Sequence, residues 1–480
     1  MRMKNLANDS PLVFVLGRNE LEDRIDVRYY KPEYRQVYKN LEGSPFKLST
    51  LKRISDKIFS GMTPLSGGPD YTTSDKGIPF VRSGDINERD VIDFDSLLYV
   101  KKQVHCQKMK SSRLEKNDLL LAIVGATIGQ VALYKYDGEA NINQAIAGVR
   151  LKKGANPDYV KWFLLTELGQ TQLERLKRPV ARANINLQEI GEIRVPLPSR
   201  ETQNSISALM QEALERGTGK EKEAESLLNS IDDYLLQELD IALSQFEGAS
   251  PYAYEIGAKS MRNKRIDVAY WKPPHRELER SIGNGKYEAM QLGELVDKTI
   301  NGLDYRDFSD SGTKYLRVGN LKPFGFDETD IKRIPLIPED VDKEIRLKAN
   351  DILLTRKGTP GVAALVGSED RHYIISSEII RLVPRGDLRM NVFYVVSILN
   401  SVIGKNQFLR KSVGAIMGSL TQIVVKSILI PFPPVSTQDR LAAEVKSRIQ
   451  RARLLKEEAG RIVSDAKERM ERILLGKENL

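Results

Sequence analysis

The sequence contains an internal duplication that spans most of its length. Arg24–Val27 returns 241 residues later as Arg265–Val268, and the same offset holds without a gap as far as Gly61 and Gly302. A chance match does not keep one register over such a stretch. Two copies of one structural unit are therefore expected. Further along, the offset drifts as loop insertions would make it drift, and the matching segments are Phe80–Asp85 with Tyr315–Asn320, Asn117–Leu121 with Asn350–Leu354, and Pro196–Pro198 with Pro431–Pro433.

Each copy ends in a long stretch whose apolar residues recur at alternating steps of four and three. This spacing keeps one seam of a helix facing a partner helix, which is typical of a coiled coil. A helix of about 40 residues extends for roughly 60 Å, further than most single domains. We predict two such helices that form one antiparallel pair. The seam residues are Ile206, Met210, Ala213, Ala224, Leu227, Ile231, Tyr234 and Leu239 in the first stretch, and Leu441, Val445, Ala452, Leu455, Ala459, Ile462, Ala466, Met470 and Ile473 in the second.

The segments before each long stretch mix strand and helix patterns. Short apolar runs separated by turn clusters predict strands, at Ile78–Arg82, Leu119–Val124, Val131–Tyr134 and Val149–Leu151. One amphipathic helix is predicted over Pro157–Leu176, with Met390–Lys405 as its counterpart. The predicted fold class is α+β, with two tandem mixed α/β domains separated by two long antiparallel coiled-coil helices in a pseudo-two-fold arrangement. The predicted domains are residues 1–199, the helix 200–246, residues 247–434 and the helix 435–480.

The amino-acid composition limits the kinds of binding partner and the cellular compartment that the chain is suited to. The 480 residues carry a net charge of +9, which favours a polyanionic partner. A single cysteine, Cys106, excludes an intrachain disulfide and suits a reducing compartment. The most apolar run, Leu119–Leu133, is interrupted by Gly125 and Gly129 and is shorter than the roughly 18 residues of a membrane span. We expect a cytoplasmic protein without a membrane segment, and we find no signal-peptide pattern.

The residues that carry catalysis in other proteins are scarce. The three histidines, His105, His275 and His372, form no zinc spacing with Cys106. Gly217–Lys220 resembles a phosphate-binding loop only in part, because Glu221 replaces the Ser or Thr that holds magnesium. These glycines fall within the first seam, so they indicate a kink or a close helix approach. No nuclease triplet and no methyltransferase fingerprint is present. We therefore expect a binding subunit with no catalytic residues and no metal site.

Several polar segments suit DNA. Ser60–Pro64 offers a hydroxyl-rich turn for phosphate contacts, and Lys177–Asn184 offers Arg and Asn, which read guanine and adenine edges. Arg356–Thr359 and Arg410–Ser412 provide similar groups in the second copy. Each basic cluster taken alone fits a solvated surface better than a base-reading loop, but their repetition favours DNA contact, because paired loops would face the same side. The candidate DNA-contacting residues are Ser60, Thr63, Arg82, Thr127, Arg178, Arg182 and Asn184 in the first copy, and Asn301, Arg317, Arg356, Lys357, Thr359, Arg410 and Lys411 in the second.

Taken together, these motifs resemble the specificity subunit of type I restriction-modification systems, over nearly the whole chain. The resemblance rests on the order and duplication of the pieces more than on any one of them. They are Arg24–Pro32 and Arg265–Pro273, the Ser-Gly-x-Thr-Pro turn at Ser60–Pro64, Pro79–Ile86, the Gly-x-x-x-Gly turn at Gly125–Gly129, Asn143-Gln144, and Val195–Gln203 leading into the helix.

The resemblance implies two target-recognition domains, each reading one half of a split double-stranded DNA sequence. The helices would set the half-site spacing and dock DNA methyltransferase subunits, two by expectation, and restriction subunits would join the assembly. S-adenosylmethionine, ATP and Mg would belong to those partners, and no cofactor to this chain. One departure is that Asn301–Tyr305 stands where the Thr-Pro turn is expected. The alternatives are a coiled-coil scaffold without nucleic-acid binding and an enzyme, such as a nuclease, with an unrecognised site.

Overall fold

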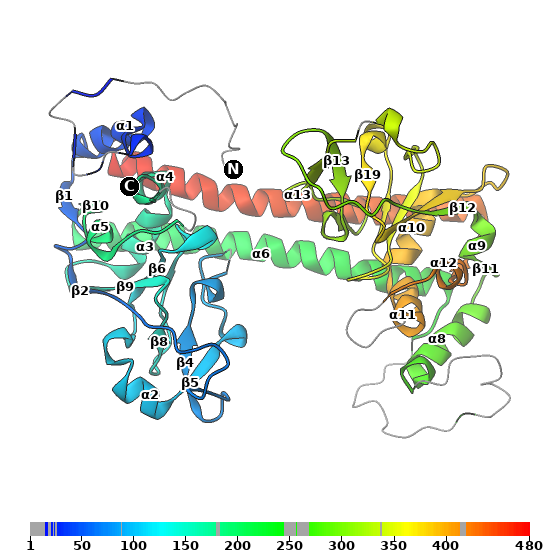
Figure 1. Ribbon diagram of the computed structural model, residues 1–480, viewed down its shortest axis with the longest axis horizontal. Helices are drawn as coiled ribbons and strands as arrows, with labels where there is room; N and C mark the ends of the chain where they lie inside the picture. Colours follow the sequence, from blue (N-terminus) through cyan, green and yellow to red (C-terminus); the bar gives the residue numbers. More distant parts are fainter. Residues whose placement is uncertain are drawn as a thin grey trace. The chain divides into compact units, whose positions relative to one another are not determined.

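The protein is described by a computed structural model that covers residues 15–17, 21–22, 24, 26–87, 89–178, 183–243, 256, 268–336, 338–412 and 419–480. The chain divides into two compact units. Unit 1 comprises residues 1–220 and 457–480, and unit 2 comprises residues 221–456. Each unit contains one copy of the duplicated segment together with part of both long helices (Figure 1).

The two longest helices are α6 (Arg200–Leu239) and α13 (Val435–Leu474), each of 40 residues. In unit 1, Ile206 and Met210 of α6 share one core with Met470 of α13. In unit 2, Leu235 of α6 shares a core with Leu441 of α13. Within each unit, the two helix segments therefore bury their seam residues against a common interior, as their apolar spacing predicts.

The glycines in α6 do not interrupt it, because the helix runs without a break from Arg200 to Leu239. A Cβ on Gly217 would lie 3.2 Å from the carbonyl oxygen of Ala459 in α13, so Gly217 permits a close approach of the two helix backbones. Lys220, at a seam position, pairs with Glu458 at 3.3 Å. Of the two predicted interpretations of these glycines, the close helix approach is confirmed within unit 1.

The globular part of unit 1 contains two four-stranded sheets and one strand pair. The first sheet has the order β2-β9-β6-β7 and is antiparallel, and the second has the order β3-β5-β4-β8 with β4 and β8 parallel. β1 pairs with β10 just before α6. The bounds are β1 Lys47–Thr50, β2 Ser55–Ser60, β3 Tyr71–Thr72, β4 Gly77–Val81, β5 Leu98–Lys101, β6 Leu119–Ala122, β7 Val131–Leu133, β8 Asn141–Ile142, β9 Ile146–Leu151 and β10 Arg194–Leu197.

The helix predicted over Pro157–Leu176 is in fact two helices that meet at Thr166. Thr166 has an extended backbone, and its Oγ1 accepts a hydrogen bond from the backbone N of Gly169 at 3.4 Å, which caps the second helix. Ser401 interrupts the counterpart in unit 2 in the same way. The prediction was wrong because apolar periodicity continues across a cap. The helices are α1 Pro32–Glu42, α2 Lys102–Gln107, α3 Pro157–Leu165, α4 Glu167–Leu176 and α5 Leu187–Gly191 in unit 1, and α8 Pro273–Gly283, α9 Leu292–Leu295, α10 Val392–Asn400, α11 Val402–Lys411 and α12 Gln422–Lys426 in unit 2.

Unit 2 repeats the strand arrangement. Its main sheet has the order β12-β20-β17-β18, and the register shift between Ser55 and Lys57 of β2 recurs between Val296 and Lys298 of β12. β13 pairs in parallel with β19, as β4 does with β8. The bounds are β11 Ala289–Gln291, β12 Val296–Asn301, β13 Thr313–Leu316, β14 Leu321–Lys322, β15 Gly325–Phe326, β16 Lys332–Ile334, β17 Ile352–Thr355, β18 Ala363–Leu365, β19 Ile374–Ile375, β20 Ile379–Pro384 and β21 Leu429–Pro431.

A buried glutamine joins each long helix to its globular part. Oε1 of Gln203 accepts a hydrogen bond from the backbone N of Asn156 at 2.8 Å, and its Nε2 donates to the carbonyl oxygen of Pro198 at 2.9 Å. Because Gln203 is 1% exposed, both bonds are shielded from water. The Pro-x-Pro and Gln motif of the sequence is therefore an anchor for the helix. The equivalent bonds in unit 2 join Gln438 to Asn391 and Pro433 at 2.9 Å each.

Candidate nucleic-acid interface

Three segments of unit 1 meet at the end of β2. Oγ of Ser60 donates to the carbonyl oxygen of Ile146 at 2.9 Å, and a Cβ on Gly61 would lie 1.7 Å from the carbonyl oxygen of Ile142. The backbone N of Asn143 in turn donates to Val81 at 3.0 Å, immediately before Arg82. Residues 60–63, 81–85 and 142–146 therefore form one contiguous surface, which we call edge 1.

The loop after β6 completes edge 1. Ile123 donates through its backbone N to Ala145 at 2.9 Å, and Gly125 donates to Ala183 at 2.9 Å. Val124 forms an isolated bridge with Asn184, and Oγ1 of Thr127 donates to the carbonyl oxygen of Val124 at 3.4 Å, so the sequence-predicted residues Thr127 and Asn184 both adjoin this loop. Gly125 has φ of 79°, a conformation that an L side chain adopts only with strain.

Unit 2 forms the same arrangement, which we call edge 2. A Cβ on Gly302 would lie 2.1 Å from the carbonyl oxygen of Ile375, and the backbone N of Ser376 donates to Leu316 at 2.9 Å. The backbone N of Arg356 donates to Glu378 at 2.8 Å. Edge 2 thus comprises residues 301–303, 316–320, 356–359, 375–378 and 419–420. It contains the predicted residues Asn301, Arg317, Arg356, Lys357 and Thr359.

One arginine in each edge is held by an acid. Arg82 donates from Nε and Nη2 to the carboxylate of Asp85 at 3.1 and 2.6 Å, and this hydrogen bonding raises the pKa of Arg82. In edge 2 Arg317 pairs instead with Asp330 at 2.8 Å, and the guanidinium lowers the pKa of that carboxyl group. A fixed guanidinium is pre-organised, but part of its hydrogen-bonding capacity is already used.

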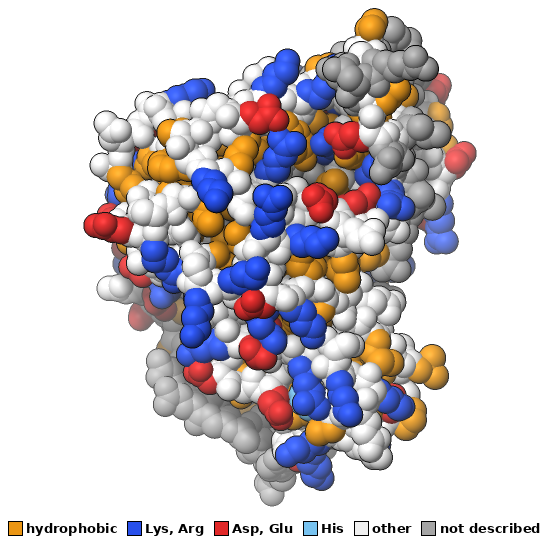
Figure 2. Space-filling view, turned by 90° about the vertical axis from the view of Figure 1, so that its left-hand side faces the viewer, with side chains coloured by type: hydrophobic (Ala, Val, Ile, Leu, Met, Phe, Trp, Pro, Cys, Tyr) orange, Lys and Arg blue, Asp and Glu red, His pale blue; other side chains and the backbone are white. Residues whose placement is uncertain are grey.

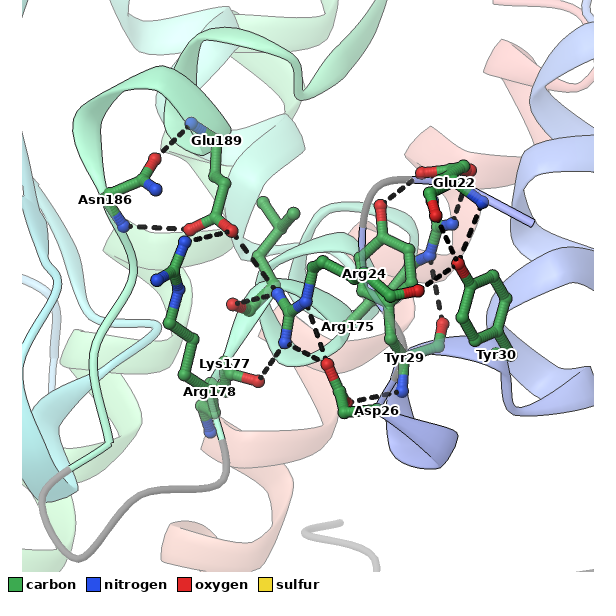
Figure 3. Close-up of polar contacts among 11 residues, drawn as sticks. Glu22, Arg24, Asp26, Tyr29, Tyr30, Arg175, Lys177, Arg178, Asn186 and Glu189 are labelled. Carbon is green, nitrogen blue, oxygen red and sulfur yellow. Dashed lines mark hydrogen bonds and ion pairs between the residues drawn. The ribbon is translucent and has the colours of Figure 1, made fainter.

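Arg178 lies at the start of the segment that leads to Asn184 and is held by Glu189. Its Nη2 lies 3.1 Å from Oε1 of Glu189, the same oxygen that Nη1 of Arg24 approaches at 3.4 Å (Figure 3). Arg24 also donates to the carbonyl oxygens of Leu176 and Lys177, so the N-terminal segment fixes the start of this loop. Arg182 lies outside the described residues.

Other predicted residues in the edges have polar side chains that could contact a ligand. In the part of the chain that the structure describes, the guanidinium of Arg356 makes no hydrogen bond or ion pair, and its Nε is buried. A buried donor without a partner costs about 1–3 kcal/mol, so a ligand that supplies an acceptor would be favoured there. The side chains of Thr63, Asn184, Asn301, Lys357 and Thr359 are exposed.

Arg410 and Lys411 require a correction, because they do not lie in a surface loop. Both belong to the last turn of α11, and Arg410 is 4% exposed. Nε of Arg410 donates to the carbonyl oxygen of Tyr270 at 2.8 Å, while Nη1 pairs with Glu279 at 2.5 Å. Nζ of Lys411 donates to the carbonyl oxygen of Ser427 at 2.8 Å. These cations hold unit 2 together, and we leave them out of edge 2.

One segment of each edge was not among the predicted contact residues. Residues 376–378 lie between Gly302 and Arg356, and Oγ of Ser376 is buried without a hydrogen-bond partner in the described structure. The equivalent in edge 1 is Asn143, whose Oδ1 accepts a hydrogen bond from the backbone N of Ala145 at 3.1 Å. The sequence feature that could have identified these two segments is their position, because both directly follow a short strand that is duplicated in the sequence.

Among the residues that the structure describes, no group of three or more His, Cys, Asp or Glu side chains is placed to hold a metal ion. No helix of that part of the chain is long and apolar enough to cross a membrane.

Comparison with known proteins finds similarity to type I restriction enzyme specificity subunits and to solved structures. The type I restriction enzyme EcoBI specificity subunit of Escherichia coli is 31% identical over 183 residues, which are 38% of this chain and 38% of that protein. The putative type I restriction enzyme MjaX specificity subunit of Methanocaldococcus jannaschii is 22% identical over 468 residues, covering 94% of this chain and 98% of that protein. A solved structure on complex assembly and conformational transition of the type I R-M system aligns with a TM-score of 0.49 at 16% identity, over 90% of this chain and 97% of that one. The HsdS subunit of Thermoanaerobacter tengcongensis aligns over the same shares with a TM-score of 0.33 at 15% identity.

The family described as type I restriction modification DNA specificity domain matches residues 44–229 and again residues 284–458. The two matches cover more than half of the chain, and each contains one edge. The resemblance inferred from the sequence motifs is therefore confirmed. The chain belongs to the type I restriction-modification DNA specificity family and carries two consecutive domains of it.

Proposed function

We propose that edge 1 and edge 2 each read one half of a bipartite double-stranded DNA target. The observation that carries this proposal is the duplication of one local arrangement. In both units a glycine at the end of a strand packs against the segment after a short parallel strand, beside an arginine-bearing turn. A specificity subunit with two such edges would recognise two half-sites. Specificity subunits are the non-catalytic DNA-recognition components of these systems, and the scaffold alternative is not supported.

Within the edges, the available side chains are the best candidates for contact with bases. Arg356 leads because its guanidinium has no partner in the described structure, and Arg is the residue that most often contacts guanine bidentately. Asn184 and Asn301 are exposed and suit adenine. Phosphate contacts suit the hydroxyl and ammonium groups of Ser60, Thr63, Thr127, Lys357 and Thr359. Positive charge that is fixed in place by an acidic partner would come from Arg82, Arg178 and Arg317.

The long helices would form the spacer between the two recognition domains. We propose that α6 and α13 pair as an antiparallel coiled coil with pseudo-two-fold symmetry, so that the length of the pair fixes the half-site separation. The shared cores in each unit support this pairing. On this view, the domains are residues 1–199 and 247–434, and the spacer segments are residues 200–246 and 435–480, which contain α6 and α13.

The partners follow from the proposed role. The spacer would dock two DNA methyltransferase subunits, and restriction subunits would join the cytoplasmic complex. S-adenosylmethionine, ATP and Mg would bind to those subunits. This division of labour fits a chain in which the sequence offers no cofactor fingerprint.

Methylation mapping tests the proposal. The chain is co-expressed with its methyltransferase, and the modified bases of the host genome are mapped. A split motif with a constant gap is expected, and a continuous motif would contradict two-edge reading. Arg356→Gln is expected to relax one half of the motif only, while Lys343→Gln, an exposed lysine of unit 2 outside edge 2, should leave both halves unchanged. Equal relaxation of both halves by Arg356→Gln would contradict the assignment of edge 2.

A further inference from the structure

Unit 1 carries a cluster of exposed cations at the opposite end of β2 from edge 1. None of them forms an ion pair within the described structure. Nζ of Lys152 lies 3.0 Å from the carbonyl oxygen of Arg53, and Nη1 of Arg200 lies 3.3 Å from that of Lys153, so these four residues lie close together. Lys52 is next to Arg53 in the chain, and Lys57 lies further along β2, where its Nζ donates to the carbonyl oxygen of Ser111 at 3.1 Å. Figure 2 looks onto the face of unit 1 near β1, β2, β9 and β10, where Lys and Arg side chains gather. We call the set the basic strip; it consists of Lys52, Arg53, Lys57, Lys152, Lys153 and Arg200.

The second copy of the fold lacks this strip. The shared register shift and the matching backbone bonds, Lys152 to Ile54 and Arg385 to Leu295, align the two units residue by residue. The positions of Lys52, Arg53, Lys153 and Arg200 are occupied by Gly293, Glu294, Gly386 and Val435. The two cations that remain are neutralised, Lys298 by Glu344 and Arg385 by Asp387 at 2.5 Å.

Nearby charges do not remove this difference. Asp56, Glu192 and Glu201 lie on the segments of the basic strip and leave it with a cationic excess. In unit 2, Lys426 is exposed beside Gly293, but Glu294 and Asp297 are exposed there too. Because the fold is the same in both units, the cations are not required to build it. Their restriction to unit 1 indicates a binding role beyond the duplicated one.

The position of the strip relative to edge 1 favours DNA as the partner. β2 runs from Ser55 to Ser60, five steps that span roughly 17 Å at about 3.3 Å per residue, and Arg53 lies in the turn just before it. A duplex rises about 3.4 Å per base pair, so the length of β2 corresponds to about five base pairs. A duplex that leaves edge 1 along β2 would bring its phosphates to the strip.

We propose that the basic strip binds the phosphate backbone of duplex DNA flanking the half-site read by edge 1, without sequence preference. This inference rests on the proposed function of edge 1. It makes the two halves of the protein unequal, since unit 1 would cover flanking duplex that unit 2 leaves uncovered.

The test uses the full-length chain assembled with its methyltransferase subunits. Binding is measured at several salt concentrations to a duplex carrying the mapped target with about ten flanking base pairs on each side, to the same target trimmed on the side of edge 1, and to a random-sequence duplex. The variant is Arg53→Gln/Lys152→Gln/Lys153→Gln. The control is Lys298→Gln/Arg385→Gln/Lys426→Gln, which removes three cations from the equivalent surface of unit 2.

The strip variant is expected to bind the long duplex at least about tenfold more weakly at moderate salt. Its slope of log affinity against log salt should be shallower by up to about 2.7, that is, about 0.9 for each phosphate that the variant no longer neutralises. The preference for target over random DNA should persist, and the trimmed duplex should bind wild type and variant alike. The control should match wild type. A strip variant with wild-type affinity and slope on the long duplex would overturn the proposal.

Two other outcomes separate this proposal from alternatives. If the strip variant binds DNA normally but assembles poorly with its methyltransferase subunits, the strip faces an acidic protein surface and the DNA proposal is wrong. If even the wild-type complex does not distinguish target from random DNA, the proposed function of the edges fails first. The single variant Arg53→Glu introduces the residue that unit 2 has at the equivalent position. It inverts one charge of the basic strip, and it tests the proposal if the triple variant misfolds.

Discussion

The guanidinium carbon of Arg175 lies 3.9 Å from the centre of the Tyr29 ring, and Nε of Arg175 donates to the carbonyl oxygen of Tyr29 at 3.2 Å. Arg410 repeats both interactions with Tyr270, at 4.4 Å and 2.8 Å. Each arginine also pairs with a glutamate, Glu22 in the case of Arg175. The duplicated Tyr of the sequence therefore anchors the segment before the first helix of each unit, to α4 in unit 1 and to α11 in unit 2.

Arg410→Met is expected to lower the free energy of unfolding by about 1–3 kcal/mol, because the carbonyl oxygen of Tyr270 loses the Nε donor and the partly exposed Glu279 keeps only Lys411, at 3.5 Å. Urea unfolding of the full chain measures this change. The salt dependence of DNA binding, compared at a temperature where the variant is folded, should remain that of wild type. A variant with normal stability and a shallower salt slope would show that Arg410 contacts DNA after all.

The arginine pairs also show where sequence reasoning stops. The duplication, the two long helices and the strands β4, β6, β7 and β9 follow from offsets and apolar periodicity, which depend on local pattern. The partner of Arg410 depends on a contact 140 residues away in the chain, with Tyr270. In the sequence alone, a basic dipeptide at a helix end cannot be distinguished from one in a surface loop, because its burial depends on tertiary packing. Equally, nothing local marks Thr166 as the cap that divides α3 from α4.

The site was predicted in part for the same reason. Ser60 and Asn301 end a strand and Arg82 follows one, and the sequence nominates them because hydroxyl, amide and guanidinium groups suit DNA contacts. Their convergence depends on which strands pair, and single-sequence patterns do not fix that pairing. Ser376 carries no signal of its own, because a serine after a short apolar run is common.

Gln203→Ala is expected to destabilise the chain by about 2–4 kcal/mol. The change leaves the backbone N of Asn156 and the carbonyl oxygen of Pro198 buried without their partner, at about 1–3 kcal/mol each. Gln438→Ala should have an effect of similar size in unit 2. Gln211→Ala, an exposed glutamine of α6, is the control and should change stability by less than about 0.5 kcal/mol. Equal urea midpoints for Gln203→Ala and Gln211→Ala would contradict the anchoring role.

Glu471 gives a pH-dependent prediction. Burial raises the pKa of this carboxyl group above 4.5, although its Oε1 accepts a hydrogen bond from the backbone N of Leu168 at 2.8 Å. A folded-state pKa above the unfolded value means that the carboxyl group favours folding at low pH and that this contribution is lost as pH rises through the folded-state pKa. Glu471→Gln keeps an acceptor without the charge, so it should be at least as stable as wild type at pH 7.5.

The measurement compares urea unfolding of both proteins at pH 7.5, 6 and 5. The advantage of Glu471→Gln should shrink as the pH falls, because wild type then gains the neutral form. Glu468→Gln, on the exposed face of the same helix, should show no such trend. Asp232 is the matched case in unit 2, since burial raises its pKa and its Oδ1 accepts from the backbone N of Val402 at 2.8 Å. A pH-independent difference for both acids would show that desolvation does not govern them.

Gly61→Ala is expected to damage edge 1 selectively. The added Cβ would lie 1.7 Å from the carbonyl oxygen of Ile142, so the segments 60–63 and 142–146 would have to separate. Overpacking of this kind costs about 1–3 kcal/mol, and the displaced turn should no longer hold Thr63 in its native position in edge 1. Gly154→Ala, where nothing lies within 4 Å of the new Cβ, is the control in the same unit. Methylation mapping should show a relaxed half-site for Gly61→Ala and the other half-site for Gly302→Ala. If both variants fold and both leave the motif intact, packing between these segments does not position the residues that read DNA.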